Sequence, residues 1–124
     1  MKTKRPVNLD IGSIKLPITS YVSILHRASG VVLFFAVALL LCAFDASLES
    51  EQSFDSLKQS LGSPIAQFFI WASLAALAYH FVAGIKHLLL DMEVGETVEG
   101  SKFASKLTIF FSAILIVLAG IWVI

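Results

Sequence analysis

Charged residues are scarce in this chain: of its 124 residues, 15% are charged and 57% are hydrophobic. The mean hydropathy of +0.86 excludes an ordinary soluble domain of this length. Cysteine is almost absent, because Cys42 is the single example. The chain therefore has neither an intrachain disulfide nor a cysteine set for an iron–sulfur cluster. It also lacks the glycine-rich motif that binds a flavin dinucleotide.

Long apolar segments occupy the space between the few charges. The clearest is residues 65–85, which are 21 residues long and contain no Asp, Glu, Lys or Arg. A helix over this segment would be about 31 Å long, enough to cross the hydrocarbon core of a membrane. Segments 28–44 and 107–124 are close to the same length. The sequence therefore predicts an all-α membrane protein, with three transmembrane helices that run up, down and up.

The predicted helices belong to a single membrane-anchor domain, residues 1–124. A polar arm precedes them, and the segments that connect them are short and rich in polar residues. We place the arm at residues 1–19 and the transmembrane helices at about 20–44, 64–90 and 103–124.

Basic residues divide unequally between the two sides of these helices. Eight of the nine lie in the N-terminal arm, at the start of the first helix or around the second loop, whereas the first loop has Lys58 alone. Because cytoplasmic loops are rich in Lys and Arg, we expect a cytoplasmic N-terminus and a periplasmic C-terminus. The polar N-terminal stretch does not match a cleavable signal peptide. We predict a multi-pass protein of the bacterial inner membrane.

The first loop contains one short amphipathic segment. We expect a small helix there that Ser53 caps at its N-terminus and Gly62 ends. The pair Ser63-Pro64 follows directly and is typical of the cap and first position of a helix. Residues 91–100 are expected to form an acidic loop on the inner side.

His80 lies in the middle of the second apolar segment. An imidazole in hydrocarbon is costly unless its ring nitrogens are satisfied. Two interpretations are open: a hydrogen bond to a neighbouring helix, or ligation of haem iron. The same helix face carries Ala76, Ala83 and Gly84. Small residues suit both the edge of a porphyrin and a close helix–helix contact.

His87 lies on the face of His80, seven residues further along and therefore about 10 Å away. Because axial ligands face each other across the iron, His87 cannot be the partner of His80 on one haem. His26 lies near the inner end of the first helix, so we expect the opposite ligand to come from another chain. His26 and His87 are better placed near haem propionates, with Arg27 as a charge partner. Basic side chains that simply mark the membrane boundary are the plainer interpretation.

A second polar cluster has the spacing of one face of the first helix. A hydroxyl and a guanidinium at the membrane boundary suit the carbonyl oxygens of a quinone, since a guanidinium stabilises negative charge that develops on reduction. An interface anchor with a capping serine explains the same residues equally well. The members of the cluster are Ser23, His26, Arg27 and Gly30.

Three motifs and the predicted topology together resemble one family. The motifs are RPVNLD at residues 5–10, SILHRASG at 23–30 and HFVAGIKH at 80–87, the last followed by Asp91. In these motifs the chain resembles the cytochrome b556 membrane anchor of succinate dehydrogenase, respiratory complex II, over nearly its whole length. Two positions depart from the family pattern. Ser29 stands where Thr is frequent, and Lys86 stands where Arg is frequent and lacks the fork of a guanidinium.

The resemblance implies haem b and ubiquinone as ligands. His80 would be one axial haem ligand, opposite a histidine of a second anchor subunit. Ser23 and Arg27 would line the quinone site, and His26, Arg27 and His87 would lie near the haem propionates. The implied partners are a flavoprotein subunit, an iron–sulfur subunit and a second membrane anchor, with no nucleic acid. The chain itself would carry out no succinate chemistry.

Three other functions share parts of this pattern. One is a fumarate reductase anchor, in which the same architecture works in the reverse direction. A second is a haem-free structural anchor, in which His80 only forms hydrogen bonds. A third is a transporter or channel subunit, but the chain has no pair of Gly/Pro-broken spans and no acidic residue at mid-membrane.

Overall fold

The computed structural model describes residues 16–124. Four helices make up this part of the chain: α1 (Ile18–Glu49), α2 (Glu51–Leu61), α3 (Pro64–Asp91) and α4 (Val98–Val123). The RPVNLD motif and most of the predicted N-terminal arm lie outside the described residues.

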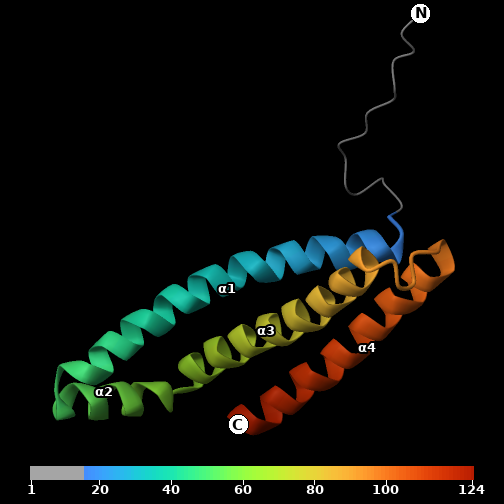
Figure 1. Ribbon diagram of the computed structural model, residues 1–124. Helices are drawn as coiled ribbons and strands as arrows, with labels where there is room; N and C mark the ends of the chain where they lie inside the picture. Colours follow the sequence, from blue (N-terminus) through green and yellow to red (C-terminus); the bar gives the residue numbers. More distant parts are fainter. Residues whose placement is uncertain (1–15) are drawn as a thin grey trace, which may run out of the picture.

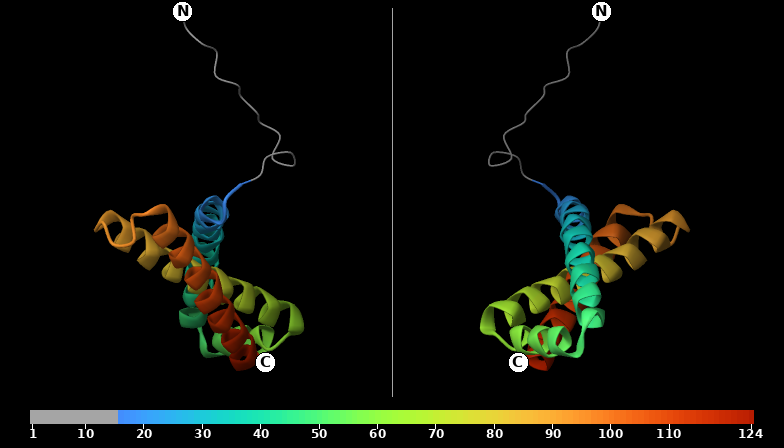
Figure 2. Two further views of the ribbon diagram at one scale, coloured as in Figure 1. Left: turned by 90° about the vertical axis from the view of Figure 1, so that its right-hand side faces the viewer. Right: turned by 90° about the vertical axis from the view of Figure 1, so that its left-hand side faces the viewer.

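The three long helices alternate in direction. The start of α1 lies at the same end as the connection between α3 and α4, and the C-terminus lies at the opposite end, near α2 (Figure 1). Helix α3 packs against both α1 and α4, and the two turned views show α3 and α4 crossing α1 at an open angle (Figure 2). All three are long and apolar enough to cross a membrane. The predicted all-helical chain with three such helices is confirmed, whereas the side on which each terminus lies stays a prediction.

The helices extend beyond the apolar segments that predict them. Helix α1 has 32 residues and is therefore about 48 Å long, more than the roughly 30 Å of a hydrocarbon core. Its first turn begins after Pro17, whose fixed φ suits that position. We expect the ends of α1 to project into the interfacial regions on both sides.

The start of α3 agrees with the sequence. Ser63 has an extended backbone, its hydroxyl oxygen accepts a hydrogen bond from the Ala66 N–H (3.3 Å), and Pro64 occupies the first turn. The cap satisfies one of the free N–H groups of a helix terminus, and proline needs no partner there. The predicted Ser63-Pro64 start is confirmed.

The start of α2 differs from the prediction. Ser50, not Ser53, is the N-cap, because its hydroxyl oxygen accepts the N–H of Ser53 at 3.0 Å. The hydroxyl of Ser53 instead donates to the carbonyl of Ala46 in the preceding helix, at 2.7 Å. The predicted end at Gly62 is confirmed. In a loop that contains several serines, the cap is decided by where the chain leaves α1, which local spacing does not reveal.

Helix α4 begins earlier than expected. Thr97 caps it by accepting a hydrogen bond from the Gly100 N–H (3.0 Å). Gly100 therefore lies in the first turn of α4 and not in the predicted acidic loop. The remaining connection is tight: Glu93 has φ of 62°, a left-handed conformation that ends α3 and lets the Val94 N–H donate back to the Leu89 carbonyl at 2.8 Å. This is the usual way in which a helix satisfies its last carbonyls.

The buried faces of the helices are small and polar, and the outward faces are apolar. Large hydrophobic side chains such as Phe34 (72% exposed) and Ile65 (73% exposed) point away from the bundle. This pattern is the reverse of a soluble core and is typical of helices that pack within lipid. Within residues 16–124, the buried side chains are Val22, Ser29, Ala83, Lys86, Ser105, Thr108 and Ser112.

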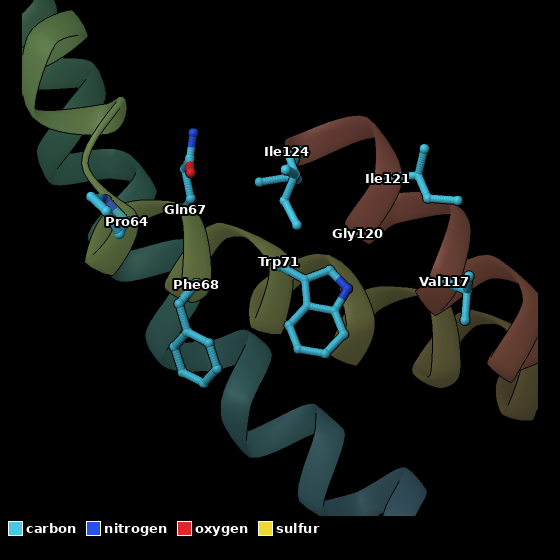
Figure 3. Close-up of a pocket in the computed structure, with 9 residues that line it drawn as sticks. Pro64, Gln67, Phe68, Trp71, Val117, Gly120, Ile121 and Ile124 are labelled. Atoms are coloured by element: carbon cyan, nitrogen blue, oxygen red, sulfur yellow. The ribbon is translucent and has the colours of Figure 1, made fainter.

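A tryptophan joins α3 to α4 near the C-terminal end of the chain. The Trp71 indole N–H donates to the carbonyl oxygen of Ile116 at 2.9 Å. A Cβ at position 120 would lie 3.0 Å from Trp71 Nε1, so glycine there leaves the indole room for its close approach, and a larger residue would push it away by a few tenths of an ångström. Figure 3 shows Trp71 directed toward the last turns of α4, in an open apolar groove of about 660 Å³.

We expect Trp71→Phe to lower the thermal stability of the membrane-extracted protein, because it removes one interhelical hydrogen bond and keeps an aromatic ring. A single bond of this kind is worth about 1 kcal/mol. Trp122→Phe is the matched control, since Trp122 is 80% exposed. Equal stability of the two variants in a thermal denaturation series would contradict the structural role of the Trp71 bond.

Candidate functional site

Three histidines form a row between α1 and α3. The His26 and His80 rings stack with centroids 4.1 Å apart and an interplanar angle of 13°. The ring of His87 also contacts that of His26: their centroids are 4.9 Å apart and their planes are tilted by 53°. His26 comes from α1, and the other two lie two turns apart on one face of α3. The structure thus brings together the three histidines that the sequence singles out.

His80 is held to α1 through one ring nitrogen. Its Nδ1 lies 3.0 Å from the hydroxyl oxygen of Ser29 and 3.2 Å from the backbone carbonyl of His26. The other nitrogen, Nε2, makes no hydrogen bond within residues 16–124. A histidine that binds a metal through Nε2 usually has its Nδ1 hydrogen-bonded in this way.

Glycine allows the His80 ring to lie close to α1. A Cβ added at Gly30 would lie 3.2 Å from His80 Cε1, closer than an ordinary van der Waals contact. Gly84 on α3 lies less close to α1: a Cβ there would be 3.8 Å from His26 Nε2, an ordinary van der Waals contact. Gly30 and Gly84 therefore serve the contact between α1 and α3.

His26 contains an orphaned polar atom. Its Nε2 is buried and has no hydrogen-bond partner within the described residues. An unsatisfied buried nitrogen costs roughly 1–3 kcal/mol, so the arrangement is better explained if a group outside residues 16–124 completes it. The stacked rings cannot share one metal ion, because imidazole lone pairs lie in the plane of the ring and the two rings meet face to face.

The donor set around His80 fits a haem that binds from outside the helix pair. One imidazole nitrogen is engaged by the protein, the other makes no hydrogen bond within the described residues and could bind a metal, and no second histidine of these residues faces it. No group of three or more His, Cys, Asp or Glu side chains within residues 16–124 could enclose a bare metal ion. The geometry therefore favours one axial ligand over a complete metal site.

The two residues expected at a quinone lie one turn apart on α1. Ser23 is partly buried and Arg27 is exposed, so that both can reach a ligand at the side of the bundle. His26 lies between them in sequence, which keeps this pair next to the histidine row. The structure holds all five predicted site residues at the same end of the helices.

Two features of the site are not evident from the sequence. Lys86 is only 6% exposed, whereas its sequence position indicates a solvated boundary residue. The Tyr79 hydroxyl donates to the carbonyl of Val22 at 2.7 Å and so fastens α3 to α1 next to His80. Helical periodicity reveals neither the burial of Lys86 nor the bond of Tyr79. Both depend on how the helices pack, and the partner of Tyr79 is 57 residues away in the sequence.

An apolar groove lies elsewhere on the molecule. It is lined by the first turns of α3 and the last turns of α4, including Gln67, Phe68 and Val117 (Figure 3). That end is opposite to the histidine row along the helices. Its lining is almost wholly apolar, so it offers no group for acid–base or redox chemistry.

Comparison with known proteins gives a consistent result. Residues 1–119 match the family described as succinate dehydrogenase/fumarate reductase transmembrane subunit. A succinate dehydrogenase cytochrome b556 subunit of Coxiella burnetii is 36% identical over 124 residues and covers 99% of each chain. Proteins of the same name from Rickettsia bellii and Paracoccus denitrificans are 33% and 28% identical, over 97% and 92% of this chain and 92% and 88% of their own.

These relatives bear on localisation as well. The matching family is a transmembrane one and most of the similar proteins are bacterial, while α1, α3 and α4 are each able to span a bilayer. The predicted multi-pass protein of the bacterial inner membrane is thereby confirmed.

We expect Tyr79→Phe to destabilise the contact between α1 and α3 by about 1 kcal/mol, because it removes the hydrogen bond to the Val22 carbonyl and little else. Tyr21→Phe is the matched control, since Tyr21 is 51% exposed. Thermal denaturation of the membrane-extracted protein measures both. A loss that is no greater for position 79 than for position 21 would contradict this role.

Proposed function

Because the chain belongs to the succinate dehydrogenase/fumarate reductase transmembrane subunit family, we propose that it holds one half of a haem b site and part of a quinone-reduction site in the membrane anchor of succinate dehydrogenase. The observation that carries this proposal is the hydrogen bonding of His80. Its Nδ1 is engaged by Ser29 and by the carbonyl of His26, which leaves Nε2 for iron.

The other half of the haem site comes from a second anchor subunit. His26 is stacked face to face on His80, and His87 lies beyond His26, so neither can take the position opposite His80. A histidine of the second anchor subunit is the remaining source of the opposite ligand. When bound, a haem with two histidine ligands supplies reversible one-electron chemistry and has no open position for oxygen.

The haem propionates are assigned to the polar residues at the same end of α1 and α3. His26 has a buried nitrogen that lacks a partner within the described residues, and a carboxylate that accepts a hydrogen bond would satisfy it. Arg27 and His87 supply further donors nearby. This assignment gives the buried Nε2 of His26 the partner that it lacks within the described residues.

Ubiquinone is assigned to the face of α1 that carries Ser23 and Arg27. The apolar tail of a quinone remains in lipid, and its carbonyl oxygens need donors near the membrane surface. The hydroxyl of Ser23 can donate to one carbonyl oxygen, and the guanidinium of Arg27 stabilises the negative charge that reduction develops. Electrons would come from the iron–sulfur subunit, and protons from the inner aqueous side.

The direction of insertion follows from the same proposal. With the N-terminus in the cytoplasm, the end that holds the histidine row, Ser23 and Arg27 faces the flavoprotein and iron–sulfur subunits. The similar proteins are named as subunits of succinate dehydrogenase. We therefore propose succinate oxidation coupled to quinone reduction as the physiological direction of the complex.

We expect His80→Leu to abolish or alter the low-spin b-type signal in a reduced-minus-oxidised absorbance spectrum of membranes that contain the complex. Leucine has no lone pair, so the iron loses one axial ligand. His87→Leu is the matched control, because His87 is assigned to a propionate and its loss leaves both axial ligands in place. An unchanged spectrum of the His80 variant at normal haem content would refute the ligand assignment.

We expect Ser23→Ala and Arg27→Ala each to lower succinate–quinone reductase activity by about tenfold or more, because removing one donor to a developing negative charge costs about 10²–10³ in kcat in a closed site and less where water has access. Succinate oxidation with a soluble artificial acceptor should stay near the native rate. Ser47→Ala, at the far end of α1, is the control variant. Equal losses in both assays would indicate failed assembly and contradict the quinone assignment.

A further inference from the structure

We infer that Ser29 is a positioning residue for the haem ligand: together with the backbone carbonyl of His26, it holds the His80 imidazole as the Nδ1–H tautomer and directs the Nε2 lone pair to iron. This inference rests on the proposed haem ligation by His80. It adds a role for a residue that touches neither haem nor quinone in that proposal.

The tautomer follows from the three contacts around Nδ1. The Ser29 hydroxyl donates to the His26 carbonyl at 2.7 Å, which uses its one hydrogen. Its oxygen then has lone pairs left for His80 Nδ1 at 3.0 Å. The His26 carbonyl, 3.2 Å from Nδ1, can only accept. Both neighbours of Nδ1 are therefore acceptors, and Nδ1 must carry the proton.

The opposite tautomer satisfies fewer groups. If Nδ1 were unprotonated, it would face the lone pairs of the His26 carbonyl, and Ser29 would have to turn its hydrogen away from that carbonyl to reach Nδ1. One hydrogen bond would then replace three. Because each interaction of this kind is worth about 1 kcal/mol, the Nδ1–H form prevails whenever the imidazole is neutral.

Burial makes this arrangement effective. Ser29 is 7% exposed, so water does not compete for its hydroxyl, and Gly30 next to it lets the His80 ring approach the α1 backbone. A serine three residues after His26 can bond back to the carbonyl of that residue, as helical serines often do. The helix thus places the hydroxyl and the carbonyl together against one ring nitrogen.

A hydrogen bond to Nδ1–H has two consequences for a metal at Nε2. It fixes the rotation of the ring, and it makes the imidazole a stronger electron donor. A stronger donor favours ferric over ferrous iron, so loss of the Ser29 hydroxyl should raise the midpoint potential of the haem. It should also weaken haem retention by roughly tenfold, the lower end of the effect that such outer hydrogen bonds have on metal binding, because the His26 carbonyl remains.

The test compares Ser29→Thr with Ser29→Val in the assembled complex. These two side chains have nearly the same shape and differ in the hydroxyl. We expect the Thr variant to keep the native midpoint potential, low-spin electron paramagnetic resonance signal and haem retention. We expect the Val variant to show a higher potential, a displaced low-spin signal and faster loss of haem to an apo-protein acceptor.

Two results would overturn the inference. One is a native potential and low-spin signal in the Val variant; the other is equal change in Thr and Val, which would make side-chain size the cause. Should the Val variant fail to assemble, Ser29→Ala decides, because it adds no volume and should change the potential in the same direction. A native low-spin signal in His80→Leu would instead refute the proposed ligation itself, and thus separates the two failures.

Discussion

Surrounding lipid deprives the helices of this chain of the force that usually brings helices together, because apolar side chains are as well accommodated by hydrocarbon as by one another. What remains is close approach and hydrogen bonding between helices. Within residues 16–124, three side-chain bonds to backbone carbonyls join the long helices, and α3 supplies the side chain in each: Trp71 to the Ile116 carbonyl, Tyr79 to the Val22 carbonyl and His80 to the His26 carbonyl. The central helix therefore holds both neighbours through polar side chains whose partners are backbone carbonyls.

At two of these contacts a glycine on the neighbouring helix makes room for the ring. Gly30 lies under His80, and Gly120 lies under Trp71, each so close that an added Cβ would be 3.2 Å or 3.0 Å from the ring. Glycine inside a helix costs about 1 kcal/mol relative to alanine, roughly the worth of the hydrogen bond it permits. The net effect of the glycine on stability is therefore close to zero, and what it provides is a fixed position of the ring. A ring held in one orientation is what a metal ligand requires.

The sequence predicts much of this architecture, for reasons that differ between elements. Three helices follow from uninterrupted apolar segments, and the Ser63-Pro64 start follows from a cap and a proline that act locally. The cap of α2 at Ser50 and the early start of α4 at Thr97 are missed, since several hydroxyl residues compete in each loop and the path of the chain selects one. The bond of Tyr79 is missed because its partner is 57 residues away, and the burial of Lys86 is missed because it depends on how the helices pack, which helical periodicity does not reveal. The histidine row could be predicted only in part. Helical spacing puts His80 and His87 on one face of α3, but the place of His26 beside them depends on the packing of α1 against α3.

Unsatisfied polar atoms distinguish a complete interface from an incomplete one. Within residues 16–124, the hydroxyl oxygens of Ser105 and Ser112 and the Nε2 of His26 are buried without a partner. The two serines on α4 have a remedy within their own helix, because a change of rotamer lets a hydroxyl donate to the carbonyl four residues earlier, as Thr108 does toward Ala104 at 2.8 Å. His26 has no such remedy, since its ring is confined by His80 on one side and His87 on the other. The interface between α3 and α4 can thus be completed within α4 itself, whereas that between α1 and α3 needs a hydrogen-bond partner from outside residues 16–124, a role that the proposed haem propionate would fill if Nε2 carries the proton.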